Sequence, residues 1–154
     1  MELLIVISII LILMLMAVPT IGSMQKRANE TSAVNSLQTI VTAELMYQNN
    51  YPRKGFTCSL TSLGGDPSLG EPTADRAQLI QPDLTSGNKH GYIFTITKCV
   101  KAESGTQYVK GYTVTAVPET VGKTGDRGFC IDQNGGPPKY DPAGGTNCTQ
   151  LLLQ

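Results

Sequence analysis

A nearly uninterrupted apolar segment at the start of the chain constrains its fold more than any other feature. Every residue from 3 to 18 is apolar except Ser8. As an α-helix this segment spans roughly 24 Å, because each residue adds about 1.5 Å. The hydrocarbon core of a bilayer is thicker, at ~30 Å. The segment is therefore typical of a marginal membrane span, of a signal-peptide core or of a helix buried inside an assembly.

The flanks of this segment argue against a cleaved secretory signal. Such a signal has a basic start and a small-residue cleavage site after the apolar run. Here the run follows the acidic Glu2 and ends at Pro19, and the first basic pair is Lys26 and Arg27. Glu2 has two interpretations: a solvated acid favoured by the helix dipole, or an acid that awaits a cationic partner inside an apolar assembly.

A helical pattern continues beyond the proline. Pro19 either ends the helix or kinks a longer one, because proline removes a backbone hydrogen bond. Apolar residues then recur at three- and four-residue spacings to about Tyr47, and Glu44 falls within this stripe. We expect one long helix, apolar all round in its first half and one-sided in its second, with Pro19 and Gly22 loosening the junction.

The later part of the chain predicts an antiparallel sheet. Residues 91–97 and 111–117 alternate aromatic or β-branched residues with small polar ones, as strands do. Residues 129–132 are a third candidate, and residues 139–140 a short fourth. Short consecutive strands joined by turns favour antiparallel pairing. The amphipathic face of residues 24–48 is available to cover the sheet, so the fold class is α+β.

Cysteine usage indicates the compartment. The chain contains four cysteines, all outside the apolar segment: Cys58, Cys99, Cys130 and Cys148. An even number in a small polar domain predicts two disulfides and an oxidising environment, with three possible pairings. A zinc site is disfavoured, because no two cysteines are near neighbours and His90 is the only histidine.

Composition and motifs exclude several classes of function. The 154 residues suit one globular domain, and the balance of twelve basic and twelve acidic residues removes the usual argument for a nucleic-acid surface. A nucleophile with a base and a phosphate-binding loop are both missing from the sequence, so we expect neither an enzyme nor a cofactor. Asp132, Asn134 and Asp141 offer only two carboxylates for calcium, and we interpret this region as a solvated turn.

The stretch ELLIVISIILILMLMAVP joins Glu2, an unbroken apolar run and Pro19 to an amphipathic continuation. This arrangement, through roughly Tyr51, closely resembles the amino-terminal segment of type IV pilins and type II secretion pseudopilins. GYIFTIT, GYTVTAVP and TGDRGFCIDQNG resemble strands of pilin heads more weakly. Family members carry a few mature residues before the glutamate, whereas Met1 directly precedes Glu2 here. Either those residues are missing from this sequence or the processing differs.

The resemblance implies a non-enzymatic subunit of a helical homo-oligomeric filament. Residues 1–23 would form the membrane and filament-core helix, and residues 24–154 an extracytoplasmic domain. The implied partners are the inner membrane before assembly, prepilin peptidase and the assembly machinery. Glu2 would meet the terminal amine of a neighbouring subunit, and Pro19 would belong to the same assembly segment. The alternatives are a periplasmic pseudopilus and a plain membrane-anchored binding module.

The resemblance also bears on the disulfides. We favour Cys58–Cys99 and Cys130–Cys148, because the second pairing closes a short carboxy-terminal loop and contributes about 3 kcal/mol. Pilins often carry a comparable bridge near the carboxyl terminus.

Overall fold

The computed structural model describes residues 2–103 and 105–152, apart from the side chains of residues 2 and 16–21. The chain is α+β, as the sequence predicts: a long helix, α1 (Glu2–Asn50), is followed by a small antiparallel sheet. We use the word head for everything described after α1. Three short helices lie between α1 and the sheet in the sequence: α2 (Leu60–Leu63), η1 (Pro67–Leu69) and α3 (Pro82–Thr85).

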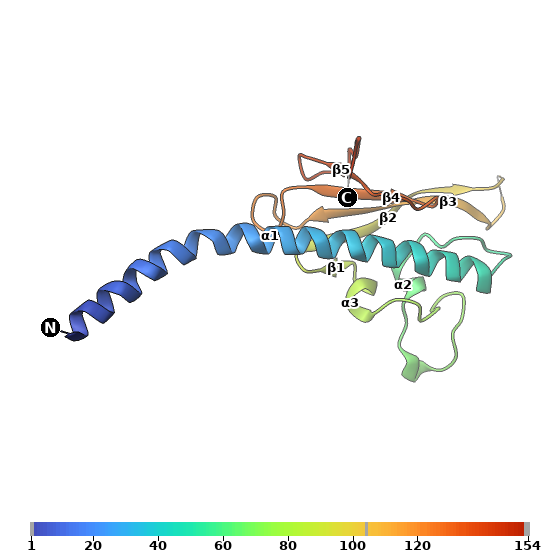
Figure 1. Ribbon diagram of the computed structural model, residues 1–154. Helices are drawn as coiled ribbons and strands as arrows, with labels where there is room; N and C mark the ends of the chain where they lie inside the picture. Colours follow the sequence, from blue (N-terminus) through green and yellow to red (C-terminus); the bar gives the residue numbers. More distant parts are fainter. Residues whose placement is uncertain (1, 104, 153–154) are drawn as a thin grey trace.

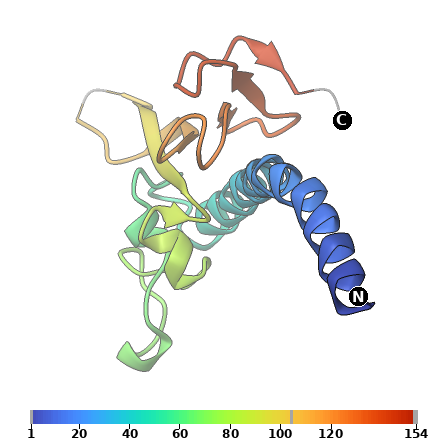
Figure 2. The same ribbon diagram turned by 90° about the vertical axis from the view of Figure 1, so that its left-hand side faces the viewer.

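Helix α1 is continuous through Pro19, so proline does not end it. Its amino-terminal half extends beyond the head and turns away from the direction of the rest of the helix (Figures 1 and 2). Proline removes one backbone hydrogen bond and is a common cause of such bends. The carboxy-terminal half lies along the head, and the helix ends at Asn50, two residues before Pro52.

The sheet has six antiparallel strands in sequence order. Its strands are β1 (Asn88–Lys89), β2 (Tyr92–Lys101), β3 (Val109–Pro118), β4 (Gly128–Asp132), β5 (Lys139–Asp141) and β6 (Gln150–Leu151). The four strands expected from the sequence are all present. The two edge strands were not predicted, because two residues are too few to show alternation.

Strand β2 is longer than the alternation suggests. Its pairing with β3 runs regularly to Thr97, which lies opposite Thr113, and then shifts before Val100. Lys98 adopts a positive φ of 49° at this irregularity. A bulge of this kind breaks the two-residue period, so the alternating pattern ends where the strand continues.

The core lies between one face of the sheet and the carboxy-terminal half of α1. Leu37 and Ile40 of the helix are fully buried, as are Val114 and Ala116 of β3. Tyr112, two residues before Val114, points to the same side because strand side chains alternate. Burying each large apolar side chain contributes about 1.5–3 kcal/mol, so this contact holds α1 on the head.

Two disulfides tie the less regular segments to the sheet. Cys58, in the segment that follows α1, pairs with Cys99 of β2, and Cys130 of β4 pairs with Cys148 near the carboxyl terminus. This is the pairing that we favoured from the sequence. The first bridge encloses 41 positions and the second 18.

Candidate assembly surface

The amino-terminal half of α1 carries an apolar surface that the head does not cover. Every residue from 3 to 15 is exposed, and all of them except Ser8 are apolar. The exposed fraction of these apolar residues ranges from 45% at Ile7 to 77% at Leu15. These residues lie on the part of α1 that projects from the head (Figure 1). We call residues 3–15 the apolar projection. Its exposure on all sides distinguishes it from the one-sided half of the same helix.

The two assembly residues expected from the resemblance lie at the ends of this region. Glu2 is the first residue of α1 and Pro19 lies within it, but the side chains of both fall outside the described residues. Among the helices that are described, none has a stretch long and apolar enough to cross a bilayer.

Where α1 meets the head, a group of polar residues holds the two together. Glu30 is almost buried, with 8% of its side chain exposed. Its Oε1 accepts hydrogen bonds from the backbone N–H groups of Asp126 (3.0 Å) and Arg127 (3.2 Å). Its Oε2 accepts from Arg127 Nε (3.0 Å) and Nη2 (2.7 Å). Four donors therefore satisfy one carboxylate, and its charge is compensated by the guanidinium.

Further contacts extend this junction along the helix. Lys26 Nζ lies 2.9 Å from Asp126 Oδ2, and Asn29 Nδ2 donates to the carbonyl oxygen of Thr124 at 2.9 Å. We call Lys26, Asn29, Glu30, Thr124, Asp126 and Arg127 the polar clasp. The Arg127 guanidinium also lies over the rings of Phe129 and Tyr140, at 5.5 and 5.2 Å from their centroids.

The sequence did not reveal the polar clasp. Its members on the helix and on the head are separated by about a hundred positions, with Glu30 and Arg127 97 residues apart. The only signal was the segment TGDRGF, which we recognised as part of a head-like pattern without assigning a partner to its charged residues.

The carboxylates considered for calcium accept hydrogen bonds from backbone N–H groups of nearby turns. Asp132 Oδ1 accepts from the N–H of Asn134 at 3.0 Å. Asp141 accepts from the N–H groups of Ala143 (2.9 Å) and Asn147 (3.0 Å) through its two oxygens. Within the described ranges, no group of three or more potential metal ligands gathers. His90 is an exposed turn residue whose Nδ1 lies 2.7 Å from Ser32 Oγ.

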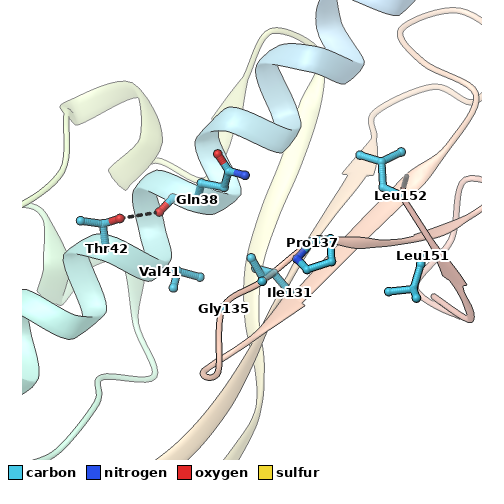
Figure 3. A pocket seen from close by; sticks show the side chains of 9 residues that line it. Gln38, Val41, Thr42, Ile131, Gly135, Pro137, Leu151 and Leu152 are labelled. Carbon is cyan, nitrogen blue, oxygen red and sulfur yellow. Dashed lines mark hydrogen bonds between the residues drawn. The ribbon is translucent and has the colours of Figure 1, made fainter. Parts of the chain in front are cut away.

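A shallow groove of about 780 Å³ separates α1 from the carboxy-terminal segment (Figure 3). Val41 of α1 faces Ile131 of β4 and Pro137 across it, and Gln38 and Thr42 form its helical rim. The other lining residues are Gly135, Gly136, Leu151 and Leu152. None of the nine side chains ionises or serves as a strong nucleophile. The groove therefore offers no groups for acid–base catalysis.

The disulfides indicate the environment of the head. Disulfides persist in oxidising compartments and are rare in the cytosol. Every cysteine of the chain is paired. These bridges therefore indicate an oxidising, extracytoplasmic location.

Together these features define an α+β protein in which a long helix is clasped to an antiparallel sheet and continues beyond it as an apolar projection. No protein-family model matches the chain, and neither the curated proteins nor the solved structures compared with it show significant similarity.

Proposed function

We propose that this protein is a structural subunit that polymerises through α1 into a type IV pilus-like filament. The observation that carries the proposal is the apolar projection. The side chains from Leu3 to Leu15, apart from Ser8, are apolar and between 45% and 77% exposed, and they lie on the part of α1 that extends beyond the head. An apolar surface of this extent marks a site of association with protein or lipid.

The division of α1 into two halves supports self-association. The carboxy-terminal half is buried against the head and fixed by the polar clasp, whereas the projection is exposed. The projection has no charged residue from position 3 to position 15 and is apolar around its whole circumference. Helices of this kind bury their surface in a bundle, at about 25 cal/mol per Å² removed from water. Copies of the same helix provide such a bundle, with the heads on its outside.

In the proposed assembly, the chain lies in the bacterial inner membrane before it joins the filament at the cell surface. Glu2 then pairs with the terminal amine of a neighbouring subunit. A carboxylate and an ammonium attract more strongly in an apolar bundle than in water, whereas a lone buried charge is strongly penalised. The pair would therefore set the axial register of subunits, and the apolar projection would supply most of the affinity.

The first experiment identifies the assembled form. Surface material is sheared from cells, imaged by electron microscopy and analysed for its subunits by mass spectrometry. Long filaments composed of this chain are the expected result. If the chain stays in the inner membrane and periplasm, the pilus proposal is wrong, and a periplasmic pseudopilus or a plain membrane anchor takes its place.

A substitution tests the mechanism. Glu2→Ala should leave the chain in the membrane fraction and abolish assembly, because the register pair is lost. Glu119→Ala, which removes an exposed acid of the head, is the matched control and should assemble normally. Normal filaments from the Glu2 variant would contradict the role of Glu2, and loss of filaments from both variants would show that the assay reports general damage.

A further inference from the structure

Glu44 is a carboxyl group placed wholly inside the protein. It lies in the half of α1 that packs on the head, and its exposed fraction is 0%. We propose that Glu44 is a proton-binding site through which pH controls how tightly α1 is held by the head. The inference is independent of filament formation, because it concerns only the contact between α1 and the head of the same chain.

The hydrogen bonds of Glu44 favour a neutral carboxyl. Oε2 accepts from the backbone N–H of Thr57 at 2.8 Å. Oε1 is buried and has no hydrogen-bond partner among the described protein atoms, and the same is true of the Tyr112 hydroxyl. An ionised carboxylate normally gathers several donors, as Glu30 does with four. One N–H group is too few to replace the water that a buried charge loses.

The surrounding charges do not favour ionisation either. The ion pairs among the described residues join Lys26 to Asp126, Lys54 to Asp75, Lys89 to Asp83 and Arg127 to Glu30, and none includes Glu44.

The ionisable groups around Glu44 are tyrosines and acids. Tyr47 of the same helix and Tyr112 of β3 interact with it electrostatically. Asp75 acts on Tyr47, and Asp132 of β4 acts on Tyr112. Thr57, in the segment after α1, contributes an uncharged backbone N–H. These groups are neutral or negative, and among the described residues no cation forms an ion pair with Glu44.

Burial therefore dominates the titration of this group. Burial raises the pKa of Glu44 from 4.5 to about 8, and the Thr57 N–H opposes the shift only in part. The folded protein holds a proton on Glu44 at neutral pH, where the unfolded chain has released it. Stability contributed by the neutral form is complete below pH 4.5, declines as the pH rises toward about 8, and levels off above it.

Deprotonation of Glu44 affects the contact between α1 and the segment at Thr57. Above pH 8 the native state must either hold a carboxylate in its core or hydrate it. Hydration of Oε2 would loosen the contact between α1 and the segment at Thr57, because this oxygen binds the Thr57 N–H. The neighbouring Cys58 is bonded to Cys99 of β2, so this segment stays attached to the sheet while its contact with the helix loosens.

The direct test follows the Thr57 amide by NMR. The 154-residue chain, held in mild detergent, is titrated from pH 5 to pH 10. We expect the Thr57 N–H resonance to shift with a midpoint near pH 8, and this transition to be absent in Glu44→Gln, whose side chain imitates the neutral acid. Glu119→Gln is the matched control and should keep the transition. The absence of a transition between pH 5 and pH 10, or a transition that survives in Glu44→Gln, would overturn the proposal.

A second measurement uses the unfolding equilibrium. Between pH 5.5 and pH 7.5, the unfolding constant of the unmodified chain should rise relative to that of Glu44→Gln by up to about tenfold per pH unit. Parallel pH profiles of the two proteins would contradict the assignment. If Glu44→Gln does not fold, the midpoint of the unmodified chain decides the question by itself.

Discussion

Glu30 of helix α1 and Arg127, which immediately precedes β4, form a two-pronged ion pair across 97 positions of sequence. Both Nε and Nη2 of the arginine donate to the same carboxylate oxygen, at 3.0 and 2.7 Å. The second oxygen accepts two backbone N–H groups of the head. This arrangement marks the point where the helix leaves the head, since residues on its amino-terminal side become exposed.

Loss of the Glu30 carboxylate should destabilise the junction. Glu30→Ala leaves two backbone N–H groups and a guanidinium without their acceptor, and we expect the free energy of unfolding to fall by about 2–3 kcal/mol. Urea denaturation followed by circular dichroism measures this change. Asp126→Ala is the control, because the Asp126 side chain is about half exposed and its ion pair with Lys26 should contribute less than about 1 kcal/mol. Equal losses in both variants would contradict the dominance of Glu30.

A charge in the middle of the apolar projection should block assembly without harm to the head. Leu11→Asp places a carboxylate where side chains would be buried in a helical bundle, and a charge at the centre of an apolar helix costs roughly 2.5–3.5 kcal/mol. We expect no filaments by electron microscopy and an unchanged unfolding midpoint of the head. Leu69→Asp is a matched control, because Leu69 is similarly exposed (62% against 56%) but lies on the head. Filaments from Leu11→Asp would count against the projection as the assembly surface.

Much of the fold follows from local patterns in the sequence. The three- and four-residue spacing of apolar residues predicted the long helix through Pro19, which the structure confirms. Two-residue alternation predicted the first part of β2 and the centre of β3, and the turn-rich segments between strands predicted antiparallel pairing. These features depend on neighbours within one helical turn or one strand, so a single sequence contains them.

The polar features of the fold depend on distant residues and were not predicted. Glu44 falls in the apolar stripe of α1, yet nothing in its neighbourhood reveals that it meets Thr57 without a cation. Likewise, Glu30 and Arg127 resemble ordinary surface charges until the fold brings them together. Tertiary contacts determine whether an acid is paired, solvated or buried alone, and sequence spacing carries little information about those contacts.

The two disulfides should differ in their effect on stability. Cys58–Cys99 spans 41 positions and Cys130–Cys148 spans 18. In the chain-entropy treatment, closing the longer loop contributes about 4 kcal/mol and closing the shorter one about 3 kcal/mol. We expect the Cys58→Ser/Cys99→Ser double variant to unfold at lower urea than Cys130→Ser/Cys148→Ser. The reverse order would mean that the carboxy-terminal bridge also stabilises native contacts that loop closure does not describe.

Gly128 should be intolerant of a side chain, because the backbone of another loop passes directly over it. A Cβ at this position would overlap the carbonyl oxygen of Gly145. That loop is held by hydrogen bonds to Asp141 and by the Cys130–Cys148 bridge, so it has little freedom to withdraw. Overpacking of this kind costs about 1–3 kcal/mol, and Gly128→Ala should lower the urea midpoint accordingly.

The matched control for this substitution is Gly22→Ala, in helix α1. A Cβ at Gly22 meets nothing within 4 Å, and alanine is a better helix former than glycine by up to about 1 kcal/mol. Gly22→Ala should therefore leave the urea midpoint of the head unchanged and raise the helical signal in circular dichroism. If both glycine variants lose the same stability, the cost at Gly128 cannot come from contact with Gly145. A loss confined to Gly128→Ala would place the constraint on the loop that Cys148 holds against β4.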